Sequence, residues 1–528
     1  MSLHPSPLPL PILLQKAGIP CPADTPATLV RGISTDSRTI RKGDVFVAIN
    51  GLHTDGRAHV AEAVAGGAVA IVTEQLDGEA SPAVAIPCIL VSNARIGAAC
   101  LFDAWYDHPA GRLCLVGVSG TNGKTSVSSL LYHILRTAGR PVGLIGTVGC
   151  KAPGDVLLSA PDGMTTPDPA VLYETLARMA DVPKGAPRPT VIMEVTSHAL
   201  ALGKVAPLRF DLAVFTNLSP EHLDLHGTME DYYNAKRRLY EVSREVVLNS
   251  DDRYGRRLLA EPLPVSRWHI CHASGPDGLP ADRMCPAGDG SCTRYYAEQP
   301  KYLGEDGVSF KLTSPDVRLR LRCPTPGRFA VMNALEAAVA ALALGISPAA
   351  VRDGLSTFPG VAGRMERIPL DASVPFSVYI DFAHTPDALE NLLSTAHTLR
   401  HRGRRIVLLF GCGGDRDRSK RKAMARVASC MADVVVITSD NSRTEDPAAI
   451  IADILRGMDK ESEFSVIPDR REAIRETVRT ARPGDIILLA GKGHETYEID
   501  RTGKHPFSES AIVAEAVHEF WQHDPPLF

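Results

Sequence analysis

The chain has 528 residues, of which 44% are hydrophobic and 22% are charged, as is usual for a folded soluble protein. A single hydrophobic core rarely extends beyond about 250–300 residues, so we expect three domains. The formal net charge is -4, which leaves no basic excess of the kind that neutralises nucleic-acid phosphates. We therefore expect no nucleic-acid partner, and any phosphate must bind at a local site.

The cysteines and the apolar runs indicate where the protein works. None of the eleven cysteines forms a CxxC pair, and the spacing of Cys271, Cys285, Cys292 and Cys323 fits no metal pattern, so we expect reduced, structural cysteines. The first 18 residues lack a basic segment and contain several prolines, which argues against a signal peptide. No run of about 18–20 uncharged apolar residues occurs, so we expect a cytoplasmic protein without a membrane span.

Residues 1–110 predict a small α/β domain. Strand-like runs at 44–49 and 68–72 flank a helical pattern at 58–65.

Residues 111–360 predict a second domain built on a parallel sheet. The apolar run 113–118 leads through a glycine-rich turn into a helical pattern at 126–138, and short β-branched runs at 190–195 and 212–216 are typical of buried parallel strands. Residues 271–300 are rich in Gly, Pro and Asp, and we expect a surface excursion there.

Residues 361–528 predict a third, Rossmann-like domain. Strands are expected at 377–381, 405–410, 433–438 and 485–490, and helices at 387–400, 420–428, 447–456 and 470–481. This alternation implies a largely parallel sheet with right-handed crossovers. No GxGxxG follows a strand, so no dinucleotide is assigned. The expected fold class is α/β, with three domains and a central P-loop-type ATPase domain.

The glycine-rich turn predicts an ATP site. It lies between a predicted strand and helix, where backbone N–H groups and the helix N-terminus face a phosphate. Lys124 would reach the β- and γ-phosphates, and the Thr125 hydroxyl would hold Mg²⁺. Val118 stands where a strict Walker motif has Gly, so the loop is a variant. The residues assigned to ATP here are Gly120, Thr121, Asn122, Gly123, Lys124, Thr125 and Ser126.

Two further features each allow two interpretations. Glu194 ends the predicted strand 190–195, at the sheet edge where open α/β folds bind ligands, and is either a Mg²⁺ ligand or a cap for a neighbouring loop. His222 and His226 are four residues apart, which fits one face of a helix or a surface turn equally.

Nine ordered blocks together resemble the Mur ligases, most closely the members that add the third residue of the peptidoglycan stem peptide to UDP-N-acetylmuramoyl-L-alanyl-D-glutamate. Each block alone is a weak motif, but all nine in one order are specific. The blocks are residues 36–38, 120–125, 165–167, 194–200, 217–227, 363–366, 381–386, 411–417 and 491–495.

The resemblance implies that residues 1–110 bind the UDP-sugar, residues 111–360 bind ATP and two Mg²⁺, and residues 361–528 bind the incoming amino acid. Lys204 stands where the family usually has Arg, which keeps the charge but loses the planar fork. The residues implied to contact the UDP-sugar-peptide are Thr35, Ser37, Thr165, Thr166, Thr196 and Lys204.

The resemblance also implies the catalytic group, namely Lys124, Glu194, His222 and Lys236. Lys236 matches a lysine that the family modifies to a carbamate (N6-carboxylysine), an anionic metal ligand, although the sequence alone shows a helix-surface lysine. The implied metal ligands are Thr125, Glu194, His222 and carbamylated Lys236, and the further nucleotide contacts are Asn333, Arg364 and Asp381. Two departures from the family pattern are Ala330 and Met164, each in place of Asn, from which we expect altered affinity and retained chemistry.

One segment bears on the amino acid. Residues 440–443 resemble the DNPR motif of members that take meso-2,6-diaminopimelate, with Ser442 in place of Pro. Arg443 would bind the distal carboxylate, which lysine lacks, and Glu495 could receive the distal ammonium. The alternative is a loop arginine beside Glu445. The residues assigned to the amino acid are Arg416, Asp440, Asn441, Ser442, Arg443, Gly491 and Glu495.

The implied activity is that of an ATP-dependent acid–amino-acid ligase in peptidoglycan synthesis, and so in cell-wall biogenesis, cell shape and division, working as a cytoplasmic monomer. Three competing interpretations are a folylpolyglutamate synthetase, a lysine-adding relative and a non-catalytic nucleotide-binding scaffold. The synthetase shares the loop chemistry, but residues 36–38 and a domain ahead of the loop argue against it.

Overall fold

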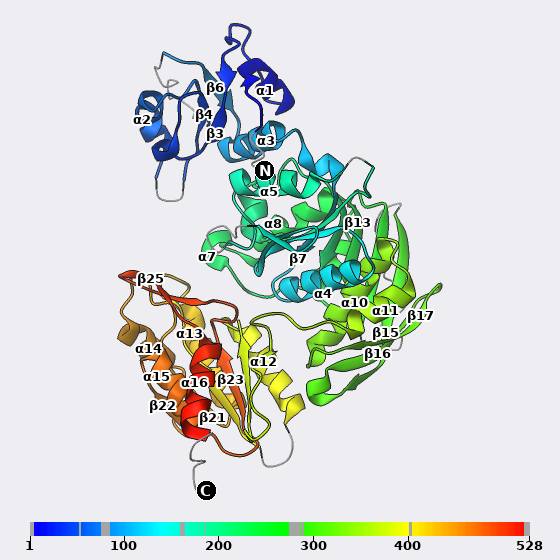
Figure 1. The fold of residues 1–528 in the computed structure, drawn as a ribbon, viewed down its shortest axis with the longest axis vertical. Coiled ribbons are helices and arrows are strands. Elements are labelled where there is room, and N and C mark those ends of the chain that lie inside the picture. The colour runs from blue at the N-terminus through cyan, green and yellow to red at the C-terminus, as the bar shows by residue number, and fades with distance from the viewer. Residues whose placement is uncertain are drawn as a thin grey trace.

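The protein consists of three sheet-centred parts that follow one another along the chain and lie in a row (Figure 1). The structure is a computed structural model that describes residues 5–51, 54–74, 85–158, 164–183, 185–273, 287, 290–400 and 404–521. The predicted α/β class with three domains is confirmed, and the boundaries after residues 110 and 360 stay predictions. Within the described ranges, no helix has the length and apolar character needed to cross a membrane.

The first part is a parallel sheet in the order β3-β4-β5-β6, flanked by helices. The predicted helix at 58–65 begins as a 3-10 turn and becomes α-helical at Val60. The strands are β3 (Gly32–Ser34), β4 (Asp44–Ala48), β5 (Ala70–Glu74) and β6 (Cys88–Val91), with the small pair β1 (Leu8–Pro9) and β2 (Leu29–Val30). The helices are α1 (Leu10–Lys16), η1 (Ser37–Thr39), η2 (Gly56–His59), α2 (Val60–Ala65) and α3 (Ala94–Trp105).

The second part is an eleven-stranded sheet in the order β10-β9-β8-β11-β7-β12-β13-β14-β15-β16-β17. Strands β8 to β15 of this order pair in parallel, and both ends of the sheet are antiparallel. The strands are β7 (Cys114–Ser119), β8 (Val142–Gly146), β9 (Gly149–Ala152), β10 (Val156–Leu158), β11 (Thr190–Glu194), β12 (Phe210–Phe215), β13 (Ser243–Asn249), β14 (Arg267–His272), β15 (Ser291–Tyr302), β16 (Val308–Thr313) and β17 (Arg318–Cys323).

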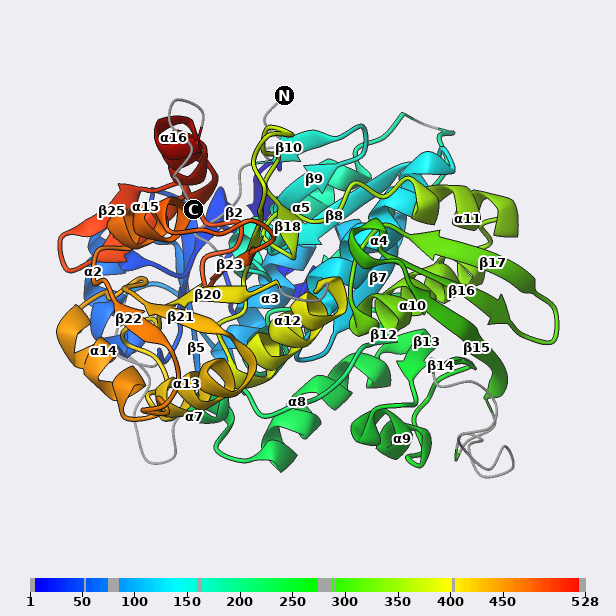
Figure 2. The same cartoon turned by 90° about the horizontal axis from the view of Figure 1, so that it is seen from below.

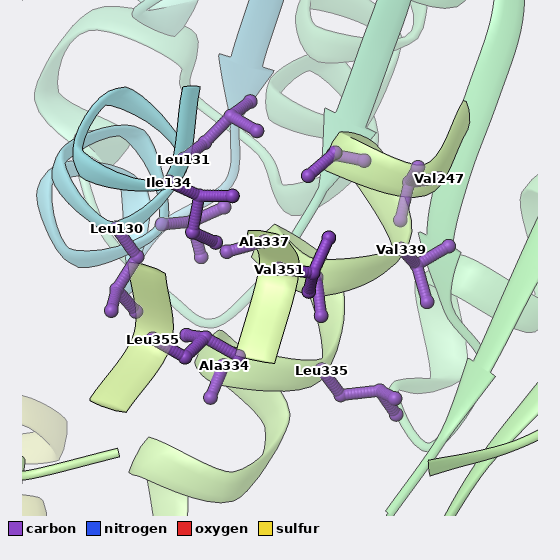
Figure 3. Packing of buried hydrophobic residues seen from close by; sticks show 14 of the residues in the cluster. Leu130, Leu131, Ile134, Val247, Ala334, Leu335, Ala337, Val339, Val351 and Leu355 are labelled. Carbon is purple, nitrogen blue, oxygen red and sulfur yellow. The ribbon is translucent and has the colours of Figure 1, made fainter. Parts of the chain in front are cut away.

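Helices cover both faces of this sheet (Figure 2). They are η3 (Pro109–Arg112), α4 (Lys124–Thr137), α5 (Pro169–Ala180), α6 (Ser197–Ala201), α7 (Leu223–His226), α8 (Met229–Glu241), α9 (Arg253–Leu259), α10 (Arg328–Ala343) and α11 (Pro348–Ser356). Helix α10 is apolar on nearly every side and lies buried between the sheet, α4 and α11. Figure 3 shows Ala334, Leu335 and Ala337 of α10 in the same buried cluster as Ile134 of α4 and Val351 of α11.

The expected surface excursion at residues 271–300 is wrong at both ends. Cys271 is fully buried in β14, and β15 starts at Ser291, pairing in parallel with β14 and antiparallel with β16. Tyr295 and Ala297 of β15 are buried, so a strand forms here although turn residues dominate the preceding segment. Most of residues 274–289, including Cys285, lie outside the described ranges, and Cys271 and Cys323 are free thiols.

The third part is a six-stranded sheet in the order β18-β19-β23-β20-β21-β22, parallel except for β18. Each predicted strand and helix of this part is present to within a few residues. The six strands are β18 (Glu366–Arg367), β19 (Ser377–Asp381), β20 (Ile406–Phe410), β21 (Val434–Ile437), β22 (Phe464–Val466) and β23 (Ile486–Ala490). A separate antiparallel pair is formed by β24 (Tyr497–Asp500) and β25 (Gly503–Pro506). The helices are α12 (Pro386–Leu399), α13 (Ser419–Met431), α14 (Pro447–Leu455), α15 (Arg470–Arg479) and α16 (Glu509–Trp521).

One turn of the second part holds the third. Glu305 lies in the 3-10 turn η6 (Gly304–Asp306) between β15 and β16. Its carboxylate accepts hydrogen bonds from the Ser377 hydroxyl (3.2 Å) and the Tyr379 hydroxyl (3.0 Å), and it pairs with Arg367 (2.7 Å). The carboxylate therefore joins the β15–β16 turn to β18 and β19.

The α4 core generates a stability prediction. Leu131 of α4 is fully buried, so Leu131→Ala leaves a cavity and should lower the free energy of unfolding by about 2–5 kcal/mol. Trp268 is the reporter in the central sheet, in a background with Trp105→Phe and Trp521→Phe, and urea unfolding followed by its fluorescence measures the effect. Leu157→Ala, at a side chain 73% exposed in β10, is the control and should change little. Equal losses in both variants would contradict the packing.

Candidate functional site

The phosphate loop joins β7 to α4 and is shaped by two glycines. Gly120 has φ 153° and Gly123 has φ 85°, in the region that favours glycine. A Cβ at Gly120 would come within 1.9 Å of the Thr216 hydroxyl oxygen, so no side chain fits. The Asn122 backbone is tied down by its N–H to Asn217 Oδ1 (2.9 Å) and by its carbonyl, which accepts from Thr216 Oγ1 (2.6 Å).

Lys124 opens α4, two residues before the predicted start, so the helix N-terminus lies directly at the loop. Its Nζ donates to the carbonyl oxygens of Gly120 (2.9 Å) and Thr121 (2.7 Å). Burial lowers the pKa of Lys124, while the nearby carboxylates Glu221 and Glu194 oppose that shift.

Glu194 lies beside the loop, with no exposed surface. Its carboxylate accepts from the hydroxyls of Thr125 and Thr147, both at 3.0 Å, and from the Thr147 N–H at 3.1 Å. The contacts with Thr147 show that Glu194 supports the β8–β9 turn, as the loop-cap interpretation expects, whereas its role as a Mg²⁺ ligand stays a prediction. Carboxylate and hydroxyl oxygens are donors that suit Mg²⁺. In the part of the chain that the structure describes, no three His, Cys, Asp or Glu side chains group as a metal site, so such an ion needs other oxygen donors as well.

Glu221 is an acidic residue that the sequence did not single out, although it adjoins His222. It lies 3.6 Å from His222 Nε2 and 3.8 Å from His384 Nε2 of the third part. Burial alone would raise the pKa of Glu221, but His222, Lys124, His384 and Lys236 together hold it below its usual value.

The two histidines do not share a helix face. His222 has φ 55° and precedes α7, whereas His226 ends it and contacts the Ser197 hydroxyl (3.0 Å). Both rings lie near His198, with centroid distances of 4.7 Å for His222 and 5.9 Å for His226.

Lys236 is not a surface lysine. Its exposed fraction is 2%, and its Nζ donates to the Gly120 carbonyl oxygen at 2.8 Å. Burial lowers the pKa of Lys236 well below 10.5, and the neighbouring Lys124 lowers it further. The turn of α8 that carries it therefore faces the phosphate loop.

A cavity of about 540 Å³ lies between the second and third parts, beside the loop. The Arg364 guanidinium comes within 3.5 Å of the Thr125 hydroxyl. Asp381 accepts from the N–H groups of Met365 (2.7 Å) and Ala383 (2.8 Å), and burial raises its pKa. Among the predicted nucleotide contacts, those that line this cavity are Asn122, Gly123, Ser126, Asn333, Arg364 and Asp381.

A second cavity, of about 640 Å³, lies between the first and second parts. Thr35, Ser37 and Lys204 line it, as do Arg38 and Asp168. Lys204 pairs with Asp168 at 2.7 Å, and its Nζ lies 3.5 Å from the Met164 sulfur.

The three predicted threonines connect to the Glu194 strand end. Thr166 donates its hydroxyl to the Glu194 carbonyl oxygen (2.8 Å) and lies 3.2 Å from the Thr196 hydroxyl. Thr196 caps α6, and Thr165 contacts Thr147 (3.0 Å). This row of hydroxyls adjoins the Glu194 carboxylate that meets the loop.

The residues predicted to bind the amino acid meet at one end of the third sheet. The Asn441 side chain donates to Glu495 (2.8 Å) and accepts from Lys492 (3.0 Å), a buried lysine that sequence reasoning did not assign. Gly491 has φ 119°, and a Cβ there would lie 2.5 Å from Asp440 Oδ2.

Arg443 and Arg416 lie at the edge of this cluster. Arg443 has φ 52° and donates to the Gly414 carbonyl oxygen (2.8 Å), while Arg416 is exposed and donates to the Asp415 carbonyl oxygen (2.9 Å). Burial and the charge of Arg416 lower the pKa of Arg443. Glu445 pairs instead with Arg418 and Arg421, so Arg443 is not simply its loop partner.

Comparisons with known proteins agree with this architecture. Three family models match successive segments: "Mur ligase family, catalytic domain" at 29–105, "Mur ligase middle domain" at 118–341 and "Mur ligase, glutamate ligase domain" at 363–493. Two similar relatives are named UDP-N-acetylmuramoyl-L-alanyl-D-glutamate–2,6-diaminopimelate ligase. The one from Geobacillus kaustophilus is 40% identical over 92% of this chain and 94% of its own length. The one from Pseudomonas aeruginosa is 40% identical over 91% of this chain and 93% of its own length.

Solved structures give the same answer. A structure of a ligase of that name superposes with a TM-score of 0.63 at 30% identity, covering 97% of this chain and 99% of the other. A MurF ligase from Thermotoga maritima in complex with ADP shares the fold, with a TM-score of 0.54 at 17% identity over 93% and 97% of the two chains. The chain belongs to the Mur ligase family.

Proposed function

We propose that the protein is an ATP-dependent ligase that joins UDP-N-acetylmuramoyl-L-alanyl-D-glutamate to meso-2,6-diaminopimelate, releasing ADP and phosphate, in peptidoglycan synthesis. The carrying observation is that three cations from separate segments converge on the phosphate loop. Lys124 and Lys236 donate to one carbonyl oxygen, that of Gly120, and Arg364 reaches Thr125. Such a concentration of positive charge, fully buried at Lys236 and partly buried at Lys124 and Arg364, favours a polyanion, as a triphosphate is.

A free carboxylate is a poor acyl donor, so the reaction needs activation. An oxygen of the D-Glu γ-carboxylate attacks the γ-phosphorus of ATP, ADP leaves, and an acyl phosphate forms. The amine of diaminopimelate then attacks the acyl carbon, a proton is lost, and phosphate leaves. Lys124 and Arg364 stabilise charge on the transferring phosphoryl group, so positioning and electrostatics supply most of the catalysis.

Thr125, Glu194, His222 and a carbamate on Lys236 are the donors we propose for two Mg²⁺, which neutralise phosphate charge when bound. Burial supports the carbamate, because a lowered pKa leaves more of Lys236 as the free amine. The amine nitrogen adds to CO₂ and releases a proton, which replaces a buried cation with an anionic oxygen ligand.

The other cavities fit the remaining substrates. The cavity lined by Thr35, Ser37 and Lys204 has room for the UDP-sugar, and the hydroxyls of Thr165, Thr166 and Thr196 extend from the second part of the chain toward Glu194. We propose that the acceptor peptide lies along these hydroxyls on its way to the loop.

The cluster of Asp440, Asn441 and Glu495 suits an amino acid with an ammonium group, and Arg443 with Arg416 suits its distal carboxylate. Arg443 is half-buried, and a ligand without that carboxylate would leave the guanidinium poorly paired. This favours diaminopimelate over lysine. The cavity at the first part argues against a folylpolyglutamate synthetase, which would not need it. The 40% identity to relatives named as ligases, over most of the chain, argues against a non-catalytic scaffold.

We also propose that the ligase works in the cytoplasm as a monomer. Its nucleotide substrate and ATP are cytoplasmic metabolites, and its role in wall synthesis would link it to cell shape and division.

The direct test is incubation with UDP-N-acetylmuramoyl-L-alanyl-D-glutamate, ATP and Mg²⁺, offering meso-diaminopimelate and L-lysine in parallel. Mass spectrometry should find the diaminopimelate adduct, with one ADP per product. Lys124→Ala should abolish both ligation and ATP turnover, because it removes the ammonium at the phosphates. Near-normal turnover in that variant would refute the loop assignment.

Amino-acid choice can be tested at Arg443. In Arg443→Ala, kcat/KM for diaminopimelate should fall roughly 100-fold or more, with little change for L-lysine, since only diaminopimelate uses the guanidinium. Arg418→Ala is the matched control: its side chain is 70% exposed in the same loop region and pairs with Glu445. Parallel losses for both amino acids would reject the assignment of Arg443.

The buried lysine predicts a pH dependence. The pKa of Lys236 is lower in the folded protein than its ordinary value of 10.5 in the unfolded chain, so between these two values the unfolded chain binds more protons. The free-energy cost of burying Lys236 therefore becomes smaller as pH rises through that range. In CO₂-free buffer, Lys236→Met should therefore be more stable than the parent at pH 7, with the advantage narrowing toward pH 10. Denaturant unfolding across this range measures it, with the exposed Lys422→Met as control. If the stability advantage of Lys236→Met over the parent grew with pH, the predicted direction of the Lys236 pKa shift would be contradicted.

A further inference from the structure

Asp387 is an acidic residue that bridges the two parts of the chain around the nucleotide cavity. It lies in the first turn of α12, in the third part. One of its oxygens, Oδ2, accepts hydrogen bonds from Asn122 Nδ2 (3.0 Å) and from Ser219 Oγ (2.8 Å), both in the second part. A single carboxylate oxygen thus joins three segments that are far apart in the sequence.

The two donors belong to a unit that is already rigid. The Asn122 N–H donates to Asn217 Oδ1 (2.9 Å), and the Ser219 N–H donates to Thr121 Oγ1 (3.0 Å). The phosphate loop and the segment after β12 are therefore tied together before Asp387 contacts them. A displacement of Asn122 or Ser219 would therefore move the whole phosphate loop.

A role inside its own helix does not account for Asp387. An acidic side chain in a first turn stabilises a helix modestly through the helix dipole. The cap of α12, however, is Thr385, whose side chain accepts from the Ala388 N–H. The Asp387 carboxylate instead accepts hydrogen bonds from Asn122 and Ser219, which both lie in the second part of the chain.

The other contacts across the same cavity are longer. Arg364 lies 3.5 Å from the Thr125 hydroxyl, and His384 lies 3.8 Å from Glu221. Asp387 forms two bonds of 3.0 Å or less, and bonds to a charged acceptor are stronger than neutral ones. Of these contacts, those at Asp387 are the best suited to hold the two parts together.

We propose that Asp387 is a positioning residue that latches the third part of the chain onto the phosphate loop. It fixes the Asn122 side chain at the cavity wall and keeps Arg364 within reach of Thr125. The kinetic part of this inference rests on the proposed ligase reaction, whereas the conformational part does not.

The test compares Asp387→Ala, Asp387→Asn and Ser219→Ala with the parent, as full-length chains. In Asp387→Ala, small-angle scattering of the ligand-free protein should give a larger radius of gyration. Its kcat should fall roughly 10- to 100-fold, the range expected for losing one or two charge-assisted hydrogen bonds. Asp387→Asn keeps an acceptor and should recover much of both values.

Ser219→Ala removes one donor without touching α12. It should reproduce part of the loss, and its effect should largely vanish when combined with Asp387→Ala, because the two residues act through one contact. Additive effects in the double variant would contradict a shared latch.

Glu472→Ala is the matched control for helix stability. Glu472 also lies in a first turn, that of α15 in the same part, and its ion pair is with Arg475 of its own helix (3.9 Å). It should leave the radius of gyration and kcat unchanged. If Asp387→Ala lowers the melting temperature as Glu472→Ala does, without expansion, the residue serves its helix only and the proposal fails.

A direct contact with the nucleotide makes a different prediction. If Asp387 instead binds the ribose hydroxyls, Asp387→Ala should reduce the preference for ATP over 2′-deoxy-ATP, and the latch is rejected. An unchanged preference with an expanded chain supports it. Because scattering needs no turnover, the latch remains testable even if the proposed ligation is not observed.

Discussion

Two ammonium groups, one buried and one partly buried, share one carbonyl oxygen in this protein. Lys124 and Lys236 both donate to Gly120, from helices that begin more than a hundred residues apart. Like charges at such close range, away from water, are costly unless anions lie near. Glu194 and Glu221 supply part of that compensation within the chain. A bound phosphate chain would supply the remaining negative charge. It would lie against the loop glycines and near Arg364 of the third part.

Much of the fold could be predicted from the sequence, for local reasons. In the third part, apolar β-branched runs alternate with amphipathic segments, so the strands and helices were predictable to within a few residues. The segment 271–300 was not, because its turn residues masked a strand whose order depends on pairing with β14 and β16. Loop glycines and the Glu194 strand end could be placed because they belong to a strand–loop–helix pattern. The burial of Lys236 could not, since position 236 stands beside two arginines and only tertiary packing turns it toward the loop.

Two departures from the family pattern lie close to the predicted site. Ala330 lines the cavity beside the phosphate loop, where a methyl group replaces an amide, and Met164 places a thioether beside the ammonium of Lys204. Neither position touches the loop carbonyls or the carboxylate of Glu194. Lys204 forms an ion pair with Asp168 through its single ammonium group, whereas an arginine could bind a carboxylate in a bidentate manner.

The Glu305 contact limits how the third part can travel. Its carboxylate contacts three side chains of that part, in β18 and β19. Three contacts to one side chain resist translation of the third part at that point and leave rotation about it possible. A separation of the two parts that kept these three contacts would have to be a rotation about Glu305, which restricts the ways in which the cavity beside the phosphate loop could widen.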